Sequence, residues 1–342
     1  MPSRKRNLLA ASGQDQPYTG DIAVAHDISP RITVYAWDSG FGDEYSDPAP
    51  EPDNDGYSVA FSPDGADIAV SHPSSPYISA YSWSSSGFGS KYSDPSTLPT
   101  GTGNGVTFSP DGSDIAIAHS SSPRISVYAW DSGFDSKYSD PSTPLPSFAN
   151  GSGVAFSPDG ADIAIAHSRS PYISVYEWSS GFGTKYSDPS TLPAGTGYGV
   201  AFSPDGADIA VAHFTSPYIS VYPWSAGFGT KYSDPSTLPT STGRSVAFSP
   251  DGYDIAVAHS SSPYISVYPW SSGFGSKYAN PSTLPTGTGY GVKFSPDGAD
   301  IAVAHSSSPY ISVYPWSSGF GTKYSDPDQL PTGAGFDVAF SP

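Results

Sequence analysis

The sequence repeats one pattern seven times, and this repetition limits the folds that the chain can adopt. Each repeat has one histidine, and a tryptophan follows it 11 residues later. Successive histidines lie 46 to 48 residues apart, a period typical of repeat architectures. A length of 342 residues would otherwise suggest two domains, but a regular repeat overrides that expectation. The histidines are His26, His72, His119, His167, His213, His259 and His305. The tryptophans are Trp37, Trp83, Trp130, Trp178, Trp224, Trp270 and Trp316.

Each repeat divides into four short stretches of strand-like sequence with turns between them. In one repeat we expect strands at 199–202, 208–213 and 218–224, and a shorter strand around 231–233. Ser-Pro-Asp-Gly separates the first two, because proline fixes φ and glycine adopts conformations that other residues resist. Four strands per period match one blade of a β-propeller. Seven repeats therefore predict an all-β fold, a seven-bladed β-propeller with four-stranded blades.

The two ends of the repeating part predict how the ring closes. The chain stops after a complete first strand, which contains Val338 and Phe340. The repeats begin with a second strand, which contains Ile22 and Val24. Together the two ends form one blade shared between the N- and C-termini, and closure removes the exposed sheet edges. We therefore expect a basic N-terminal arm at 1–17 and a propeller at 18–342.

Two resemblances accompany this pattern. Phe-Ser-Pro-Asp-Gly before a short apolar strand, as at 202–206, resembles the WD-repeat-like propellers over residues 18–342. The chain departs from them because it has no Gly-His dipeptide and only two repeats in which Trp-Asp ends the third strand. The longer string at 210–222, Ala-Val-Ala-His-x-x-Ser-Pro-Tyr-Ile-Ser-Val-Tyr, resembles propeller repeats of tailed-phage virion proteins and related bacterial proteins. This second resemblance implies a virion setting and no residue-level mechanism.

The charge of the chain bears on its partners. The formal net charge is −18, and nucleic acid is not an expected partner because phosphate binding requires a basic surface. No run of 18 apolar residues exists, so no membrane span is expected. Arg4, Lys5 and Arg6 precede only four apolar residues, too few for a secretory signal. We interpret this segment either as a frayed end or as a docking arm for an acidic partner, and we expect a virion or cytoplasmic location.

The repeated histidines and aspartates have structural interpretations. One histidine per blade, at the end of a strand, favours a hydrogen bond to a neighbouring loop. Paired aspartates beside a turn could bind calcium, but Ca²⁺ takes about 6–8 oxygen ligands and this segment supplies few. Aspartate is also a favoured turn residue, so we expect no metal and no cofactor. The pairs are Asp64 and Asp67, Asp111 and Asp114, Asp159 and Asp162, Asp205 and Asp208, Asp251 and Asp254, and Asp297 and Asp300.

No catalytic constellation is visible in the sequence. It contains no Gly-x-Ser-x-Gly elbow, phosphate loop or His-Glu-x-x-His motif. Near-identical blades supply no asymmetric set of nucleophile, base and stabiliser, and the positions that vary form no recognisable one. Those positions include Arg31, Arg124, Arg169, Glu177, Phe214, Arg244, Tyr253 and Lys293.

These observations favour a non-enzymatic role. We expect a structural or interaction propeller, such as a tail, fibre or decoration component of a phage virion, that binds other proteins of an assembly. The alternative is a multivalent glycan-binding lectin. Its aromatic platforms for sugars would come from Phe182, Phe228 and Phe274, although packing in the core is the other interpretation of these rings. A propeller enzyme is the third interpretation.

Overall fold

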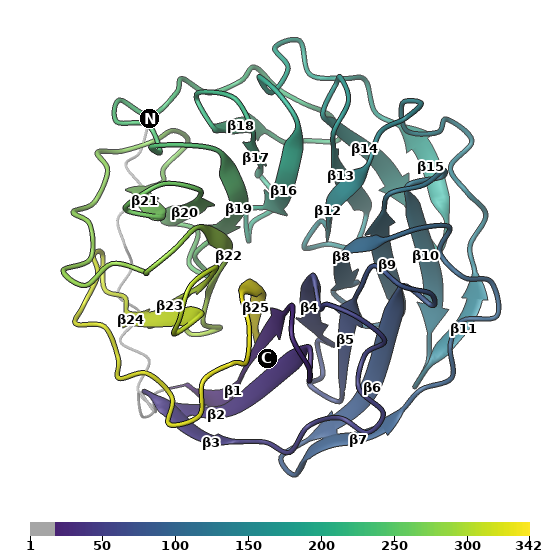
Figure 1. Cartoon of the computed structure of the whole chain (residues 1–342). Helices are drawn as coiled ribbons and strands as arrows, with labels where there is room; N and C mark the ends of the chain where they lie inside the picture. Colours follow the sequence, from purple (N-terminus) through teal and green to yellow (C-terminus); the bar gives the residue numbers. More distant parts are fainter. Residues whose placement is uncertain (1–17) are drawn as a thin grey trace, which may run out of the picture.

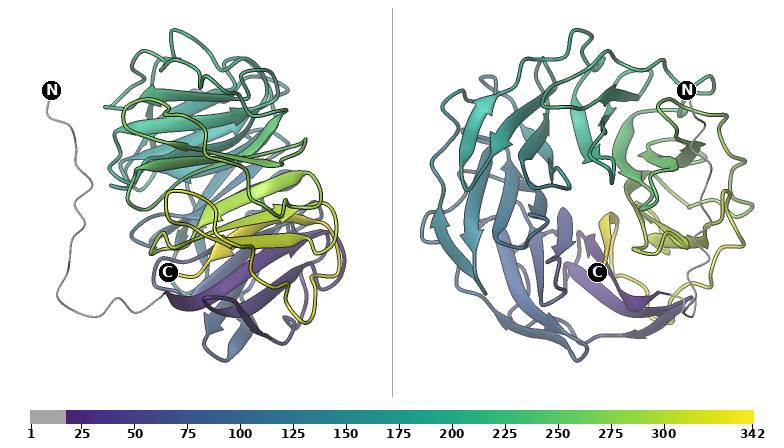
Figure 2. Two further views of the ribbon diagram at one scale, coloured as in Figure 1. Left: turned by 90° about the vertical axis from the view of Figure 1, so that its left-hand side faces the viewer. Right: turned by 180° about the vertical axis from the view of Figure 1, so that it is seen from behind.

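A computed structural model describes residues 18–342 as a ring of seven β-sheets around one axis (Figure 1). The described residues contain 25 strands and no helix, which confirms the prediction of an all-β, seven-bladed β-propeller. Seen from behind, the innermost strands again encircle the axis (Figure 2). No helix of the described part is long and apolar enough to cross a membrane. The proposed docking arm, with Arg4, Lys5 and Arg6, lies outside the described residues.

The strands of each blade run antiparallel from the axis to the rim. The innermost strands are β25 (Gly335–Phe340), β4 (Ser58–Phe61), β8 (Gly103–Phe108), β12 (Gly151–Phe156), β16 (Gly197–Phe202), β19 (Gly243–Phe248) and β22 (Gly289–Phe294). The second strands are β1 (Thr19–His26), β5 (Asp67–Ser71), β9 (Asp114–His119), β13 (Asp162–His167), β17 (Asp208–His213), β20 (Asp254–His259) and β23 (Asp300–His305). The third strands are β2 (Ile32–Asp38), β6 (Ile78–Ser84), β10 (Ile125–Trp130), β14 (Ile173–Trp178), β18 (Ile219–Pro223), β21 (Ile265–Pro269) and β24 (Ile311–Pro315). The fourth strands are β3 (Phe41–Glu44), β7 (Gly87–Lys91), β11 (Phe134–Lys137) and β15 (Phe182–Lys185).

The ring closes through a blade that both ends of the chain build. Strand β25 pairs with β1, with Ile22 opposite Phe340 and Val24 opposite Val338. Ile22, Val24 and Val338 are fully buried. The Tyr18 hydroxyl also donates a hydrogen bond to the Ser341 carbonyl at 2.6 Å. This pairing is the closure that the two ends of the sequence predict, and it removes the exposed edge that each end would otherwise have.

The fourth strand is absent as a strand from three of the seven sheets. In these blades a proline precedes the tryptophan, as Pro223 precedes Trp224. The Trp224 N–H bonds inward to the Ala207 carbonyl, so the N–H of the preceding residue would point outward to the fourth strand. Proline has no N–H, and only a single bridge between Trp224 and Phe228 remains. The three prolines are Pro223, Pro269 and Pro315.

Our expectation of a fourth strand around 231–233 is therefore wrong for its blade. Where a fourth strand forms, it also starts earlier in the repeat than expected, at or directly before the phenylalanine. Strand β15 at Phe182–Lys185 is an example. At its start, Phe182 packs edge-on against Trp178 with 5.1 Å between ring centroids, and Phe228 packs in the same way against Trp224 in a blade without a fourth strand.

The core lies between adjacent blades. Small residues on one face of a second strand meet large residues on the next blade: Ala164 belongs to the same buried cluster as Ile209, Tyr222 and Trp224. This alternation of small and large side chains lets neighbouring sheets pack closely. The same arrangement recurs in the other clusters of buried residues, so each blade depends on both neighbours for its hydrophobic burial.

Each tryptophan also links its blade to the preceding one through an aspartate, which is buried in six blades and half-buried at Asp21. Trp224 Nε1 donates to Asp162 Oδ2 at 2.8 Å, and the Tyr186 hydroxyl donates to Asp162 Oδ1 at 2.7 Å. The first aspartate of this pair, Asp159, instead accepts the Ser157 hydroxyl and the Ala161 N–H within the turn. The equivalent tryptophan bonds run from Trp37 to Asp300, Trp83 to Asp21, Trp130 to Asp67, Trp178 to Asp114, Trp270 to Asp208 and Trp316 to Asp254. We call these seven Trp–Asp pairs the interblade network.

Candidate functional site

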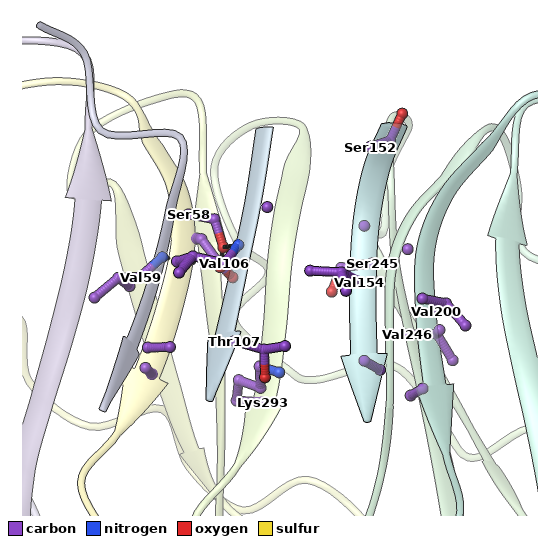
Figure 3. A pocket seen from close by; sticks show the side chains of 18 of the residues that line it. Ser58, Val59, Val106, Thr107, Ser152, Val154, Val200, Ser245, Val246 and Lys293 are labelled. Atoms are coloured by element: carbon purple, nitrogen blue, oxygen red, sulfur yellow. Dashed lines mark hydrogen bonds between the residues drawn. The ribbon is translucent and has the colours of Figure 1, made fainter. Parts of the chain in front are cut away.

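A cavity of about 830 Å³ lies on the axis of the propeller, and residues from all seven innermost strands line it. Figure 3 shows this wall from close by, with strands side by side. A smaller cavity of about 250 Å³ lies beside Pro63, Pro110 and Pro342, near the turns that follow these strands. The innermost strand of each blade stays unpaired on the side that faces the axis.

The innermost strands present equivalent residues at five wall positions, numbered along the strand; in β16 they are residues 198–202. Wall position 1 holds Tyr57, Asn104, Ser152, Tyr198, Arg244, Tyr290 and Phe336. Wall position 2 holds Ser58, Gly105, Gly153, Gly199, Ser245, Gly291 and Asp337. Wall position 3 holds valine in every blade, and wall position 5 holds phenylalanine. Wall position 4 holds Ala60, Thr107, Ala155, Ala201, Ala247, Lys293 and Ala339.

Three charged side chains break this repetition. Arg244, Lys293 and Asp337 are each the single charged residue at their wall position, and all three line the larger cavity. They come from three consecutive innermost strands, β19, β22 and β25. The lining thus carries two cations and one carboxylate, whereas the chain as a whole has a net charge of −18. The cavity is therefore the place where an anionic small molecule is attracted to an otherwise acidic protein.

Asp337 is held in a fixed orientation. Its Oδ2 accepts the Ser58 hydroxyl at 2.7 Å and the Val59 N–H at 3.3 Å, both from the next blade. Its Oδ1 accepts the Val338 N–H at 2.9 Å. Burial raises the pKa of the Asp337 carboxyl, and this effect outweighs the nearby Lys293 cation, which lowers the same pKa. An ionised carboxylate has about four lone-pair positions, so these three bonds leave one on Oδ1 for a ligand.

Arg244 forms part of an aromatic rim at wall position 1. Its guanidinium carbon lies 4.7 Å from the centre of the Tyr198 ring and 5.7 Å from that of Tyr290. Its Nε donates to the Ser260 hydroxyl at 3.0 Å. The rim continues through Phe336, whose ring meets Tyr290 edge-on with 5.3 Å between centroids. Stacking between two aromatic rings fixes the plane of the guanidinium and leaves its terminal nitrogens available for a ligand.

Lys293 is exposed on the cavity wall, at the level of Thr107 and away from the end where Ser152 lies (Figure 3). Among residues 18–342, no carboxylate lies within 4.0 Å of its Nζ and no hydrogen bond involves its side chain. The lysines near the rim of the other repeats differ, because each bonds to the side chain three residues on. That side chain is an aspartate in five repeats, as for Lys91 with Asp94 at 2.9 Å, and is Asn280 for Lys277. Lys293 is thus a cation that faces the cavity without a fixed anionic partner in the described chain.

The repeated histidines lie elsewhere, within the blades. All seven are fully buried, and each Nε2 meets a serine or threonine hydroxyl of the third strand, as His213 meets Ser220 at 3.1 Å. Burial lowers the pKa of His213 to about 4, so the ring is neutral near pH 7. Across the described residues, no group of three or more His, Asp or Glu side chains could hold a metal ion.

From the sequence we named Arg244 and Lys293 as variable positions but did not place them in one site. We also did not recognise Asp337 as a site residue. The signal was present in the repeats. Aligning the first strands of the seven blades places each of the three charges among neutral equivalents. What the alignment lacked was the knowledge that these strands all face one cavity.

The fold and this cavity define the class of the protein: a seven-bladed propeller with one asymmetric axial site. No protein-family model matches the chain, and no curated protein matches its sequence. A candidate 6-phosphogluconolactonase from Bacteroides fragilis is similar in structure over 96% of this chain and 99% of its own, with a TM-score of 0.72 and 14% identity. The periplasmic gluconolactonase of Pseudomonas aeruginosa covers 95% and 99%, with a TM-score of 0.70 and 15% identity. A candidate 6-phosphogluconolactonase from Bacteroides uniformis covers 94% and 99%, with a TM-score of 0.67 and 16% identity.

At such low identity the similarity establishes the shared fold, and it also corrects our functional expectation. We expected a non-enzymatic structural component of a phage virion. The comparison contradicts this, because these full-length structural neighbours bear the names of lactonases and are not phage proteins. The resemblance to tailed-phage repeats therefore has no support, whereas the resemblance to propellers holds at the level of the fold.

Proposed function

We propose that the protein is a hydrolase that opens the ring of a sugar-acid lactone in its axial cavity. One observation carries this proposal: Arg244, Lys293 and Asp337, the three charges that break the repeat of the inner wall, converge on one cavity. A base and two cations in a single pocket form the asymmetric set that ester hydrolysis requires. The lactonase names of the structural neighbours support the same reaction class.

In this proposal Asp337 is the general base. Its raised pKa makes the carboxylate more basic, and its free Oδ1 position can accept a proton from water. The water oxygen attacks the lactone carbonyl carbon while its proton passes to Asp337. The carbonyl π electrons move to the oxygen and give a tetrahedral oxyanion. When this collapses, the bond from the carbonyl carbon to the ring oxygen breaks, and Asp337 returns its proton to the ring oxygen to give the open hydroxy acid.

The two cations have different roles. Lys293 faces the cavity without a partner among the described residues, so its charge can stabilise the developing oxyanion. Arg244 is fixed between two tyrosine rings at the rim, where it orients the substrate. The rings of Tyr198 and Tyr290 offer apolar faces to the sugar carbons beside it.

The test is acid release from glucono-1,5-lactone and its 6-phosphate, measured by pH-stat titration above the spontaneous rate. We expect the wild-type protein to accelerate hydrolysis of at least one of them, and Asp337→Asn to lower kcat about 10²- to 10⁴-fold, the usual contribution of a general base. Asp43→Asn, at an exposed position of the outer strand β3, is the matched control and should keep full activity. Wild-type protein without acceleration, or a fully active Asp337→Asn variant, contradicts the proposal.

A further inference from the structure

We infer that the wall formed by β12, β16 and β19 is an oxyanion-binding site built from backbone N–H groups together with Arg244. The group bound there is a phosphate or carboxylate of the substrate. In naming that group as part of a substrate, the inference rests on the proposed hydrolase function. Anion binding itself is independent of catalysis and can be measured without turnover.

The N–H group at wall position 3 points toward the axis in every blade. Each innermost strand pairs on one side only, so alternate N–H groups face its partner and the others face away from it. In β16, the Ser203 N–H that follows the strand bonds to the Asp208 carbonyl of β17. Because the direction of the N–H group alternates along the strand, the N–H groups of Ala201 and Gly199 also point toward β17. The N–H group of Val200 lies between them and points toward the cavity. The same bond recurs at Ser157 and Ser249, which places the N–H groups of Val154 and Val246 likewise.

In four blades this N–H group donates a hydrogen bond to a side chain. The Val106 N–H donates to the Ser58 hydroxyl at 3.4 Å, and the Val292 N–H donates to the Ser245 hydroxyl at 3.4 Å. The N–H groups of Val59 and Val338 both donate to the Asp337 carboxylate. Except for Val338, the side chain that accepts comes from wall position 2 of the preceding blade. A polar residue at that position therefore caps the N–H of the next blade.

In the other three blades the capping position of the preceding blade is glycine, so no side chain covers the N–H group. These glycines are Gly105, Gly153 and Gly199. The N–H groups that they leave open belong to Val154, Val200 and Val246 in three consecutive blades. Backbone geometry maintains the glycines, because a Cβ on Gly153 would lie 2.7 Å from the Tyr198 carbonyl oxygen. Val154 and Val200 are also partly exposed to the cavity, whereas Val246 is 4% exposed and Val292 and Val338 are fully buried.

Arg244 completes the site. It lies two residues before Val246 on β19, or about 7 Å along the strand. Among the described residues no carboxylate is within salt-bridge distance of its guanidinium. Convergent backbone N–H groups form concavities that bind anions, and an arginine beside them adds charge and bidentate hydrogen bonds. The preferred substrate is therefore a lactone that carries a phosphate or a carboxylate, and a neutral sugar lactone is a poorer one.

The test is calorimetric titration of the full chain with inorganic phosphate, glucose 6-phosphate, gluconate and glucose. Glucose 6-phosphate and gluconate distinguish a phosphate group from a carboxylate, and glucose is the neutral control. Ser245→Gly removes the hydroxyl that accepts the Val292 N–H and so adds a fourth open N–H group to those of Val154, Val200 and Val246. We therefore expect about threefold tighter binding of the anions. Gly199→Ser supplies a cap for the Val246 N–H, and we expect at least fivefold weaker binding. At this position an added Cβ would lie 3.0 Å from the Ser245 Cα, the mildest contact of the three glycines.

Each outcome of this titration decides the inference. Opposite effects of Ser245→Gly and Gly199→Ser on the anions, with none on glucose, support the backbone site. Anion affinity that is unchanged in Ser245→Gly, whose melting temperature shows that it is folded, overturns it. Anion binding that follows the expected order in a protein without lactonase activity would overturn the proposed function and leave the anion site intact.

Discussion

The interblade network and the inner wall belong to the same blades but follow different rules. In the network, the seven tryptophans all donate to an aspartate of the neighbouring blade, at 2.8 to 3.1 Å. In the inner wall, the equivalent residues differ at wall positions 1, 2 and 4. The comparison shows at which equivalent positions the residues of a repeat protein can differ between repeats. Seven blades close a ring only if each contact between blades has the same geometry, whereas the wall faces a cavity and makes no such demand.

The largest expected effect comes from breaking the network. In Asp208→Ala, the Trp270 N–H and the Tyr232 hydroxyl lose their acceptor inside the protein. Each buried donor left without a partner costs about 1–3 kcal/mol, so we expect the free energy of unfolding to fall by about 2–5 kcal/mol. Urea denaturation measures the change.

The control for this prediction is Asp234→Ala in the same repeat. Asp234 pairs with Lys231 on the surface, and an exposed ion pair contributes about 0–1 kcal/mol. Equal losses of stability in the two variants would show that the network is not what holds neighbouring blades together.

A second, intermediate effect concerns pH and the buried histidines. His213 has a pKa of about 4 in the folded protein, against 6.5 for an ordinary histidine. Above pH 6.5 the ring is neutral in both states and its contribution to stability is complete. As the pH falls from 6.5 to 4, this histidine is protonated in the unfolded chain but stays neutral in the folded protein. The free energy of unfolding therefore falls by about 1.4 kcal/mol per pH unit for this residue.

The measurement compares urea denaturation of the wild type and His213→Gln at several pH values. The variant loses the hydrogen bond to Ser220 and should be less stable at pH 7.5, but its stability should fall less steeply between pH 6.5 and 4. Because both proteins carry the same carboxylates, their titration cancels in the difference. Parallel curves would mean that the buried ring takes up its proton as readily as the unfolded chain does.

The smallest effect on stability is expected at the inner wall. Lys293→Ala introduces the residue that five other blades carry at wall position 4, and Lys293 is exposed to the cavity. We expect a change within about 0.5 kcal/mol in the free energy of unfolding. Lactone hydrolysis should nevertheless fall, because the oxyanion loses its cation. The contrast with Asp208→Ala fails if Lys293→Ala unfolds the protein, or if it keeps full activity in the pH-stat assay.

Particular residues show how far sequence reasoning reached. The repeat of His and Trp predicted the seven blades, and the residues around Ile22 and Val338 predicted the closure. Both predictions were possible because local sequence patterns indicate strands and turns. We did not predict the reduction of the fourth strand, although the prolines that cause it, Pro223, Pro269 and Pro315, are visible in the sequence. Whether a proline disrupts the pairing depends on the direction in which the missing N–H group would point. We expected both aspartates of each pair to be turn residues. The first bonds within the turn, as Asp159 does, whereas the second accepts a tryptophan N–H from the next blade, as Asp162 does from Trp224, 62 residues on.

By itself the sequence determined the architecture, because every repeat carries the same strands, turns and large apolar residues, and like units stacked side by side bury these residues only as a closed ring. Only the tertiary structure decided the candidate site. Arg244, Lys293 and Asp337 are separated by 49 and 44 residues in the chain, and nothing local to any one of them indicates the others. They meet because the first strand of each blade runs beside the same axis, so that single substitutions in separate repeats become neighbours around one cavity.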